Sequence, residues 1–374
     1  MSSHDLDSVR RRIRELDREL ISLAAERVAL ARRVGELKRQ EGQPIVDFAQ
    51  ELRVMNRARE EALEHGLDPS IAENLLARLI RAAITVQEED NVRSAAGGVG
   101  QRAVLVGGSG RMGHWMASFL AAQGYETLNL DPRGAEDENA RAEAALATAE
   151  LVISAAPPSA TASLYRSWCA RPPGGVICDL ASIKTPLIEP IRALQRAGGR
   201  VASLHPMFGP STVVLRGADV VVCETDDELA TDLAEALFRP TTARLVRIPL
   251  LHHDRLMADL LTLAHATAIA FALALPETGP PLQSPTFRVL EGLATAVVRE
   301  SADVYFEIQA DNPHSLSAIE RLRAAVEELL SVVRARDRRD FHRLMEDGQK
   351  RTAAASESST SRTDDRGSAR PATP

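Results

Sequence analysis

The chain has 374 residues, with 45 Lys and Arg against 52 Asp and Glu, which gives a formal net charge of −7. Hydrophobic residues make up 44% and charged residues 26%, the balance of a globular protein large enough for more than one domain. The acidic balance argues against a nucleic-acid partner. Because the sequence shows no run of about 20 apolar residues and no apolar leader, we expect a cytoplasmic protein with no membrane partner.

A long amphipathic helix is predicted over about residues 6–40. Its apolar positions alternate in steps of three and four, as in a coiled coil, and they are Leu6, Val9, Ile13, Leu16, Leu20, Leu23, Leu30, Val34 and Leu37. A helix about 50 Å long cannot bury this stripe within a short helical domain, so we expect an intertwined homodimer. Two further helices are expected, one ending near His65 and one from Asp68-Pro69 to about Glu89.

Two cations break the apolar stripe of the first helix. Arg27 stands where the spacing predicts an apolar residue, and Lys38 projects from the same face eleven residues later. Cations on an inner face need anionic partners, because their desolvation is costly. Either nearby acids such as Asp47 and Glu51 form a structural ion-pair network with them, or the two cations bind a small dianion.

A nucleotide-binding motif is expected after a small-residue linker at residues 93–101. The apolar run that starts at Arg102 leads into a Gly-x-Gly-x-x-Gly sequence, and a helical stretch follows. In this context the glycines permit a tight turn and a close approach of the backbone to a pyrophosphate, and the helix N-terminus faces the phosphates. The cofactor-binding residues expected from the motif are Gly108, Gly110, Arg111, Met112 and Gly113.

The next predicted strand ends in Asp131, 18 residues past Gly113. A carboxylate at this place hydrogen-bonds a ribose 2′-hydroxyl and repels a 2′-phosphate, so it favours NAD over NADP. Arg133 is close enough to leave NADP open.

Residues 102–250 are predicted to form a doubly wound α/β Rossmann domain, because helical stretches alternate with strands. The later strands are expected at residues 151–156, 176–180, 200–204, 220–223 and 244–248. Ligands of such domains bind at the carboxyl ends of the strands. His205 is expected just past a strand, where an imidazole can act as a general base or hydrogen-bond acceptor for a hydroxyl being oxidised. A lone histidine is more often structural.

Residues 251–351 are predicted to form a helical domain. Its notable polar side chains are His252, His253, Asp254, His265, Arg288 and Arg299. In isolation these indicate surface or helix-end polarity. The histidine pair beside Asp254 is a weak indication of a metal site, and because no further ligands follow at a fixed spacing we expect no metal. Residues 352–374 lack large apolar side chains and are predicted to be a disordered tail.

Several motifs in this order resemble those of a known enzyme family. They are Ala25-Glu-Arg27, Val34-Gly-Glu-Leu-Lys38, Gly107-Gly-Ser-Gly-Arg-Met-Gly113, Asp179-Leu-Ala-Ser-Ile-Lys184 and Leu204-His-Pro-Met-Phe-Gly-Pro210. Residues 1–92 resemble the all-helical chorismate mutases, and residues 102–351 resemble prephenate dehydrogenase, as in the bifunctional T-proteins of tyrosine biosynthesis. The resemblance implies an all-α mutase domain, a Rossmann domain, and an all-α domain for dimerisation and substrate binding.

For the mutase, the resemblance implies that Arg27 and Lys38 are the catalytic cations that hold the carboxylates and ether oxygen of chorismate. The further substrate-binding residues would be Arg10, donated by the neighbouring subunit, together with Asp47, Glu51 and Gln87. Chorismate rearranges pericyclically, so such a site needs no nucleophile. It holds a compact conformer and stabilises charge on the breaking ether oxygen.

Two mutase positions depart from the family pattern. Gln50 stands where an arginine is usual, and Ala83 stands where a serine is common. The loss of a cation from a dianion site weakens binding. The departures therefore leave open a weak or absent mutase activity, or a related substrate.

For the dehydrogenase, the resemblance implies that His205 is the catalytic histidine and that Ser182 orients it or the substrate hydroxyl. Substrate-site roles are also implied for His253, His265 and Arg288. The family arginine that binds the ring carboxylate aligns with Ala296, and Arg299, three residues on, is its candidate substitute.

The implied function is conversion of chorismate to prephenate, followed by NAD-dependent oxidative decarboxylation of prephenate to 4-hydroxyphenylpyruvate. Two alternatives stay open. The same chemistry could act on 4-amino-4-deoxychorismate and the matching prephenate. In the other alternative only the dehydrogenase is active, and the N-terminal domain serves dimerisation or regulation.

Overall fold

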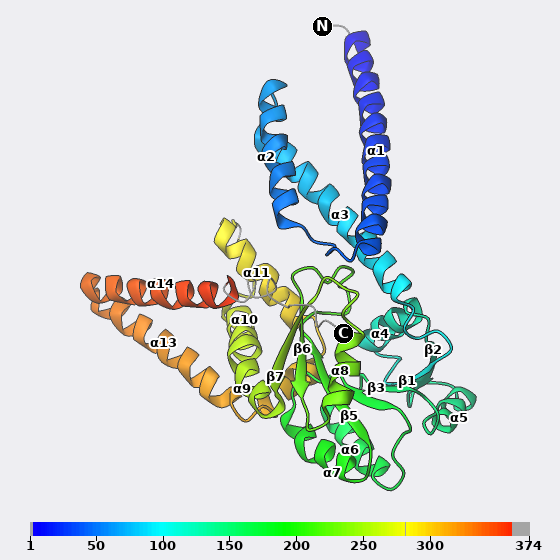
Figure 1. Ribbon diagram of the computed structural model, residues 1–374. Coiled ribbons are helices and arrows are strands. Elements are labelled where there is room, and N and C mark those ends of the chain that lie inside the picture. The colour runs from blue at the N-terminus through cyan, green and yellow to red at the C-terminus, as the bar shows by residue number, and fades with distance from the viewer. Residues whose placement is uncertain (1–2, 281, 361–374) are drawn as a thin grey trace. The chain divides into compact units, whose positions relative to one another are not determined.

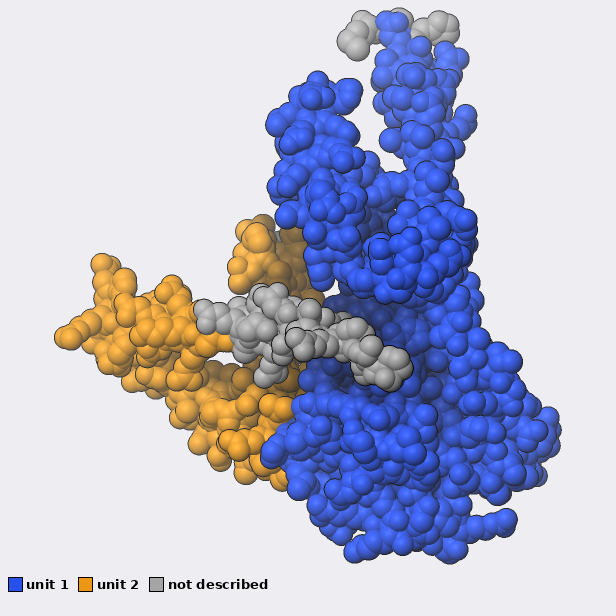
Figure 2. Space-filling view, in the orientation of Figure 1, with its two compact units in different colours: residues 1–253 blue, residues 254–374 orange. Residues whose placement is uncertain are grey.

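The computed structural model describes residues 3–280 and 282–360, and the chain divides into two compact units at His253 (Figure 2). The first unit, residues 1–253, contains the N-terminal helices and the predicted nucleotide-binding domain. The second unit, residues 254–374, contains the C-terminal helices.

The N-terminal part consists of α1 (Ser3–Gln40), α2 (Phe48–Glu64) and α3 (Pro69–Ala95), and both α1 and α2 pack against α3 (Figure 1). The Asp47 side chain caps α2, and the Asp68 side chain caps α3, so both helix starts have their N–H groups partly satisfied. The predicted long helix is confirmed, and its apolar stripe is 42–62% exposed. This single chain therefore leaves the stripe uncovered.

The third helix is longer than predicted. It continues past Glu89 to Ala95 and so includes the start of the predicted linker at residues 93–101. Arg93 extends it by pairing with Glu89 and Asp90, one helical turn back. The helix ends where Ala96 adopts a left-handed conformation with φ of 44°.

The middle part is built on a seven-stranded sheet with strand order β2-β1-β3-β4-β5-β6-β7, parallel except for the antiparallel pair β5–β6. The strands are β1 (Arg102–Val106), β2 (Glu126–Leu130), β3 (Leu151–Ser154), β4 (Val176–Asp179), β5 (Arg200–Pro206), β6 (Asp219–Glu224) and β7 (Arg244–Pro249). The helices are α4 (Arg111–Ala122), α5 (Glu136–Ala145), α6 (Pro158–Trp168), α7 (Ile188–Arg196) and α8 (Glu228–Ala236). The predicted doubly wound domain is confirmed.

Helices cover both faces of this sheet and bury an apolar core on each. One core joins α4 and α8 to alternate strand residues such as Leu105 and Leu204. The other joins α5, α6 and α7 to the opposite set, such as Val104 and Val201. Because the side chains of a strand alternate between faces, one apolar run supplies both cores.

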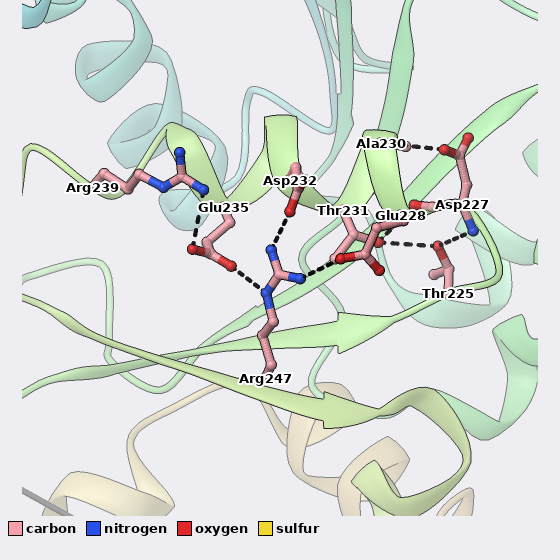
Figure 3. A network of polar contacts seen from close by, with 9 residues as sticks. All are labelled: Thr225, Asp227, Glu228, Ala230, Thr231, Asp232, Glu235, Arg239 and Arg247. Carbon is pink, nitrogen blue, oxygen red and sulfur yellow. Dashed lines mark hydrogen bonds and ion pairs between the residues drawn. The ribbon is translucent and has the colours of Figure 1, made fainter. Parts of the chain in front are cut away.

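The outer strand β7 is fixed to α8 by one arginine. Arg247 forms ion pairs with Glu228 at 2.7 Å and Glu235 at 2.5 Å, and also with Asp232 (Figure 3). These carboxylates raise the pKa of Arg247, so the guanidinium stays charged throughout the usual pH range.

The second unit is helical, as predicted. Its helices are α10 (Leu263–Ala274), α11 (Pro285–Val298), α12 (Ala302–Ala310), α13 (Ser315–Ala335) and α14 (Arg338–Thr360), and α9 (His253–Met257) spans the boundary. A π-helical turn at Ala258–Thr262 precedes α10, and the Thr262 hydroxyl lies 2.7 Å from the Ser315 hydroxyl. This buried hydrogen bond joins the start of α10 to the start of α13.

Two sequence-based expectations about this region, the absence of a long apolar helix and a disordered tail, need correction. By length and composition, Leu250–Ala274 is one candidate membrane span, although it contains ionisable residues such as Asp254, Arg255 and Asp259. The predicted disorder from Thr352 onward is wrong for residues 352–360, which continue α14, where Ala353–Ala355 supplies strong helix formers. The rest of the predicted tail lies outside the described residues.

Candidate active sites

The Gly-rich loop between β1 and α4 forms a cradle that side chains would fill. A Cβ added to Gly113 would lie 2.4 Å from the Gly107 carbonyl oxygen, so this position tolerates only glycine. The N-cap of α4, Gly110, provides no side-chain cap, which leaves the first N–H groups of the helix available to an anion. Arg111 and Met112 are the first residues of that helix. The residues present therefore fit the pyrophosphate of a dinucleotide.

Asp131 follows β2 and faces this loop. Its carboxylate accepts hydrogen bonds from the backbone N–H of Ser109 at 3.0 Å and of Arg133 at 2.9 Å. Burial alone would raise the pKa of Asp131, but these hydrogen bonds outweigh it and the pKa is lowered. The guanidinium of Arg133 lies 3.4 Å from the same carboxylate. An ionised acid therefore stands where the ribose of a dinucleotide is expected.

His205 lies within β5, and the expectation that it falls just past a strand is wrong. Antiparallel pairing with β6 extends the strand to Pro206 and places His205 opposite Val221. Its Nδ1 lies 2.9 Å from Nε2 of His253, which follows β7 in the sequence. Burial lowers the pKa of His205 well below its usual value, and the neighbouring His253 and Lys184 lower it further. The imidazole is therefore neutral at physiological pH.

An ion pair lies beside this histidine. Lys184 and Asp179 are both fully buried, with 2.6 Å between Lys184 Nζ and Asp179 Oδ1. Lys184 also donates to the Leu204 carbonyl at 2.8 Å, one residue before His205. Both residues stand in a motif that the sequence analysis singled out, but the sequence alone does not show that they form a buried ion pair.

Ser182 is half-buried in the loop after β4, between Asp179 and Lys184. Because β4 and β5 are neighbours, this loop and the end of the strand with His205 belong to the same edge of the sheet. The role of Ser182 stays a prediction. In the described part of the chain, no group of three or more His, Cys, Asp and Glu residues is placed to hold a metal ion.

The other predicted substrate residues belong to the second unit. The His265 ring on α10 forms a T-shaped contact with the Tyr305 ring at a centroid distance of 4.6 Å, and burial lowers the pKa of His265. Arg288, in the first turn of α11, and Arg299, at its C-cap, are exposed. Their roles stay predictions.

In the helical part, neither Arg27 nor Lys38 forms an ion pair with an acid of the part of the chain that the structure describes. Lys38 Nζ donates to the Ile45 carbonyl at 3.1 Å. Arg27 is half-buried, and among the side chains that the structure describes, those of residues 5–280 and 282–355, its guanidinium forms no ion pair. Gln87 is buried on α3 and donates to the Ala31 carbonyl on α1 at 2.5 Å. Gly35 permits this approach, because a Cβ there would lie 2.6 Å from Gln87 Cγ.

The two predicted acids, Asp47 and Glu51, bind groups other than Arg27 and Lys38. One Asp47 carboxylate oxygen accepts from the Gln50 N–H at 2.9 Å. Glu51 binds Arg216 at 2.7 Å, a residue of the middle part that the sequence did not single out. These acids thus do not form an ion-pair network with Arg27 and Lys38. Arg10 is 61% exposed on α1. The Ala83 side chain is buried, which leaves no polar group at this position.

Known proteins match both parts of the chain. Residues 9–88 match the family model described as chorismate mutase type II, and residues 125–247 match that of the prephenate dehydrogenase nucleotide-binding domain. A T-protein of Enterobacter agglomerans is 28% identical over 344 residues, covering 90% of each chain. A 4-amino-4-deoxyprephenate dehydrogenase of Streptomyces pristinaespiralis is 29% identical over 268 residues, covering 66% of this chain and 90% of that protein.

Among solved structures, the prephenate dehydrogenase of A. aeolicus, in complex with hydroxyphenyl propionate and NAD+, has a TM-score of 0.53. It is 16% identical and covers 68% of this chain and 98% of its own, so it supports the fold. The fold and the family matches define a helical isomerase domain joined to a nucleotide-dependent oxidoreductase. The chain belongs to the bifunctional chorismate mutase–prephenate dehydrogenases, the enzymes of tyrosine biosynthesis that combine both activities.

Proposed function

We propose that this cytoplasmic enzyme converts chorismate to prephenate in its helical N-terminal part. The dehydrogenase part then oxidises prephenate with NAD to 4-hydroxyphenylpyruvate and carbon dioxide. The observation that carries the proposal is a pair of half-buried cations without protein counter-ions among the described residues. Arg27 and Lys38 meet no carboxylate in the part of the chain that the structure describes. A dianionic substrate supplies the missing charge.

In the mutase reaction, Lys38 and Gln87 stabilise the breaking ether oxygen, and Arg27 holds a carboxylate. Gln87 is kept near α1 by its bond to Ala31 and by the space that Gly35 leaves. Fixed donors of this kind need no reorganisation when charge develops on the ether oxygen, so they lower the barrier.

In the dehydrogenase reaction, the neutral His205 accepts a hydrogen bond from the ring hydroxyl at Nε2. The bond between its Nδ1 and His253 holds the ring in one orientation. Burial disfavours protonation of His205, and the neighbouring His253 and Lys184 lower its pKa further. As the hydride leaves the ring carbon, the hydroxyl shares its proton with His205, the carboxylate departs as carbon dioxide, and the ring becomes aromatic. Bound NAD supplies the hydride acceptor.

The NAD preference rests on Asp131. Its ionised carboxylate attracts a ribose hydroxyl and repels a 2′-phosphate. Arg133 is paired with that carboxylate, which reduces its availability to a phosphate.

The active molecule is a homodimer in this proposal. The apolar stripe of α1 is exposed in the single chain, and the α1 helix of a second copy would bury it with an apolar stripe of the same length and spacing. Arg10, near the N-terminus of α1, would then reach the mutase site of the neighbouring subunit.

One experiment tests the substrate assignment. The purified chain is given chorismate, prephenate, or their 4-amino-4-deoxy analogues with NAD, and the products are identified by mass spectrometry. We expect 4-hydroxyphenylpyruvate from both hydroxy substrates, with higher kcat/KM than for the amino analogues. A preference for the amino analogues would overturn the assignment.

A second candidate function is the same chemistry on those amino substrates. The Streptomyces relative, named for 4-amino-4-deoxyprephenate, matches 66% of this chain. Gln50 and Ala83 depart from the mutase pattern, which also favours an altered substrate. The same experiment distinguishes the two.

A further inference from the structure

The loop between β5 and β6, residues 207–218, joins the two catalytic parts of the first unit. It begins two residues after His205. Trp115 on α4 holds its middle, because the indole N–H donates to the Thr212 carbonyl at 2.9 Å and the ring lies 4.9 Å from that of Phe208. The loop is therefore anchored on the dehydrogenase side.

The far end of this loop binds the mutase helix α3 through a buried carboxylate. Glu88 is 5% exposed and accepts from the Leu215 N–H at 3.0 Å. The N–H of Thr242 donates to its other oxygen at 3.0 Å, and the Thr242 hydroxyl donates there too. Charge-assisted bonds from two dehydrogenase segments therefore fix α3 at the residue next to Gln87.

The next loop residue binds the mutase helix α2. Arg216 donates to Glu51 at 2.7 Å, and its guanidinium carbon lies 5.6 Å from the centre of the Phe48 ring. The Arg216 and Glu51 side chains are 30% and 23% exposed, so solvent screens the pair only in part. Two contacts of different type therefore fix the first turn of α2.

We propose that Arg216 is a positioning residue of the mutase site: by holding Glu51 it sets the first turn of α2 relative to Gln87 on α3. This rests on the proposed function and takes Glu51 as the substrate-binding residue that the family resemblance implies. Arg216 acts through Glu51, so it is no catalytic residue. The geometry of the mutase site thus depends on a dehydrogenase loop anchored at Leu215 and Arg216.

The variant Arg216→Met in the full chain tests this, because methionine removes the charge but keeps an apolar contact with Phe48. We expect mutase kcat/KM to fall about tenfold, since small displacements of binding groups cost catalysis. Dehydrogenase kcat and KM with prephenate stay unchanged, and Arg216→Lys recovers part of the loss. The matched control is Arg192→Met, which removes an arginine paired with Glu189 at 3.1 Å on α7.

A double-variant cycle tests whether Arg216 acts through Glu51. In a Glu51→Gln background, Arg216→Met should cause no further loss of mutase kcat/KM. Additive losses, or an unchanged mutase in the single variant, would overturn the proposal.

Hydrogen exchange separates this proposal from the proposed function. Arg216→Met should speed amide exchange at residues 48–55, and Arg192→Met should not. If the wild-type chain turns over no chorismate, the proposed function fails, while the exchange rates still decide whether Arg216 orders α2. Unchanged exchange in Arg216→Met would contradict the positioning role.

Discussion

At the scale of single residues, the proposed dehydrogenase site combines a neutral imidazole with a buried charge pair. Burial lowers the pKa of His205, which keeps the imidazole neutral, whereas Asp179 keeps the Lys184 ammonium charged. The pKa of Lys184 is raised even though burial opposes it, because the Asp179 carboxylate outweighs the desolvation. The pair therefore maintains a cation close to a histidine that stays neutral.

The lowered pKa of His205 predicts a pH-dependent stability. The unfolded imidazole titrates near about pH 6.5, so its stabilising contribution is complete above that pH and decreases as the pH falls toward the folded pKa. His205→Asn removes this contribution. Urea unfolding of the wild type and of His205→Asn should be compared between about pH 8 and pH 5. The unfolding free energy of the wild type minus that of the variant should decrease as the pH falls. A difference that is constant over this range would contradict a depressed pKa.

A second prediction concerns the buried pair. Lys184→Met leaves Asp179 charged and unpaired inside the protein, which should lower the unfolding free energy by roughly 3–5 kcal/mol. The double variant Asp179→Asn with Lys184→Met removes both charges and should recover part of that loss, as measured by urea unfolding. Equal destabilisation of the single and double variants would show that the loss does not come from an unpaired charge.

At the scale of elements, the cofactor loop depends on the space at the start of α4. Gly113→Ala would push a methyl group against the Gly107 carbonyl, so the helix must move away from β1. NAD binding, followed by titration, should weaken at least about tenfold, because the phosphate-binding N–H groups move with the helix. Gly348→Ala on α14 is the matched control, with no atom within 4 Å of the added Cβ. Equal NAD affinity in both variants would contradict the cradle.

The local patterns predicted these elements well. The three-four spacing gave α1, and strand-glycine-helix succession gave β1 and α4, because both depend on neighbours in sequence. The extension of β5 through His205 was missed, since it depends on pairing with β6, which is not local. The helix at residues 352–360 is not evident from composition, because this segment lacks large apolar side chains even though several of its residues favour a helix.

The same limit applies to the candidate sites: the sequence shows their local motifs but not the contacts between distant segments. The sequence predicts roles for His205 and the Gly-rich loop, which stay predictions, whereas the contact of His205 with His253 joins segments 48 residues apart. Glu51 and Arg216 are 165 residues apart, and no sequence signal connects them. Long-range partners of this kind follow from the fold alone.

At the scale of the whole molecule, the exposed stripe of α1 predicts a dimer that one charge should disrupt. Leu20 is 55% exposed within the stripe, and burial of an aspartate there against a second copy is costly. Leu20→Asp should therefore shift the protein toward monomer in sedimentation and lower mutase activity. Ser22→Asp, which adds the same charge on another face of α1, should do neither. A Leu20→Asp protein that remains dimeric would contradict the proposed seam.

The central claim is that one chain carries two separate sites that act in succession on the same small diacid. The most direct test supplies chorismate and NAD to the His205→Asn variant and follows prephenate and NADH together. Prephenate should accumulate at the wild-type mutase rate while NADH formation falls by roughly two to four orders of magnitude. NADH formation at the wild-type rate, or no prephenate from a folded variant, would contradict the central claim.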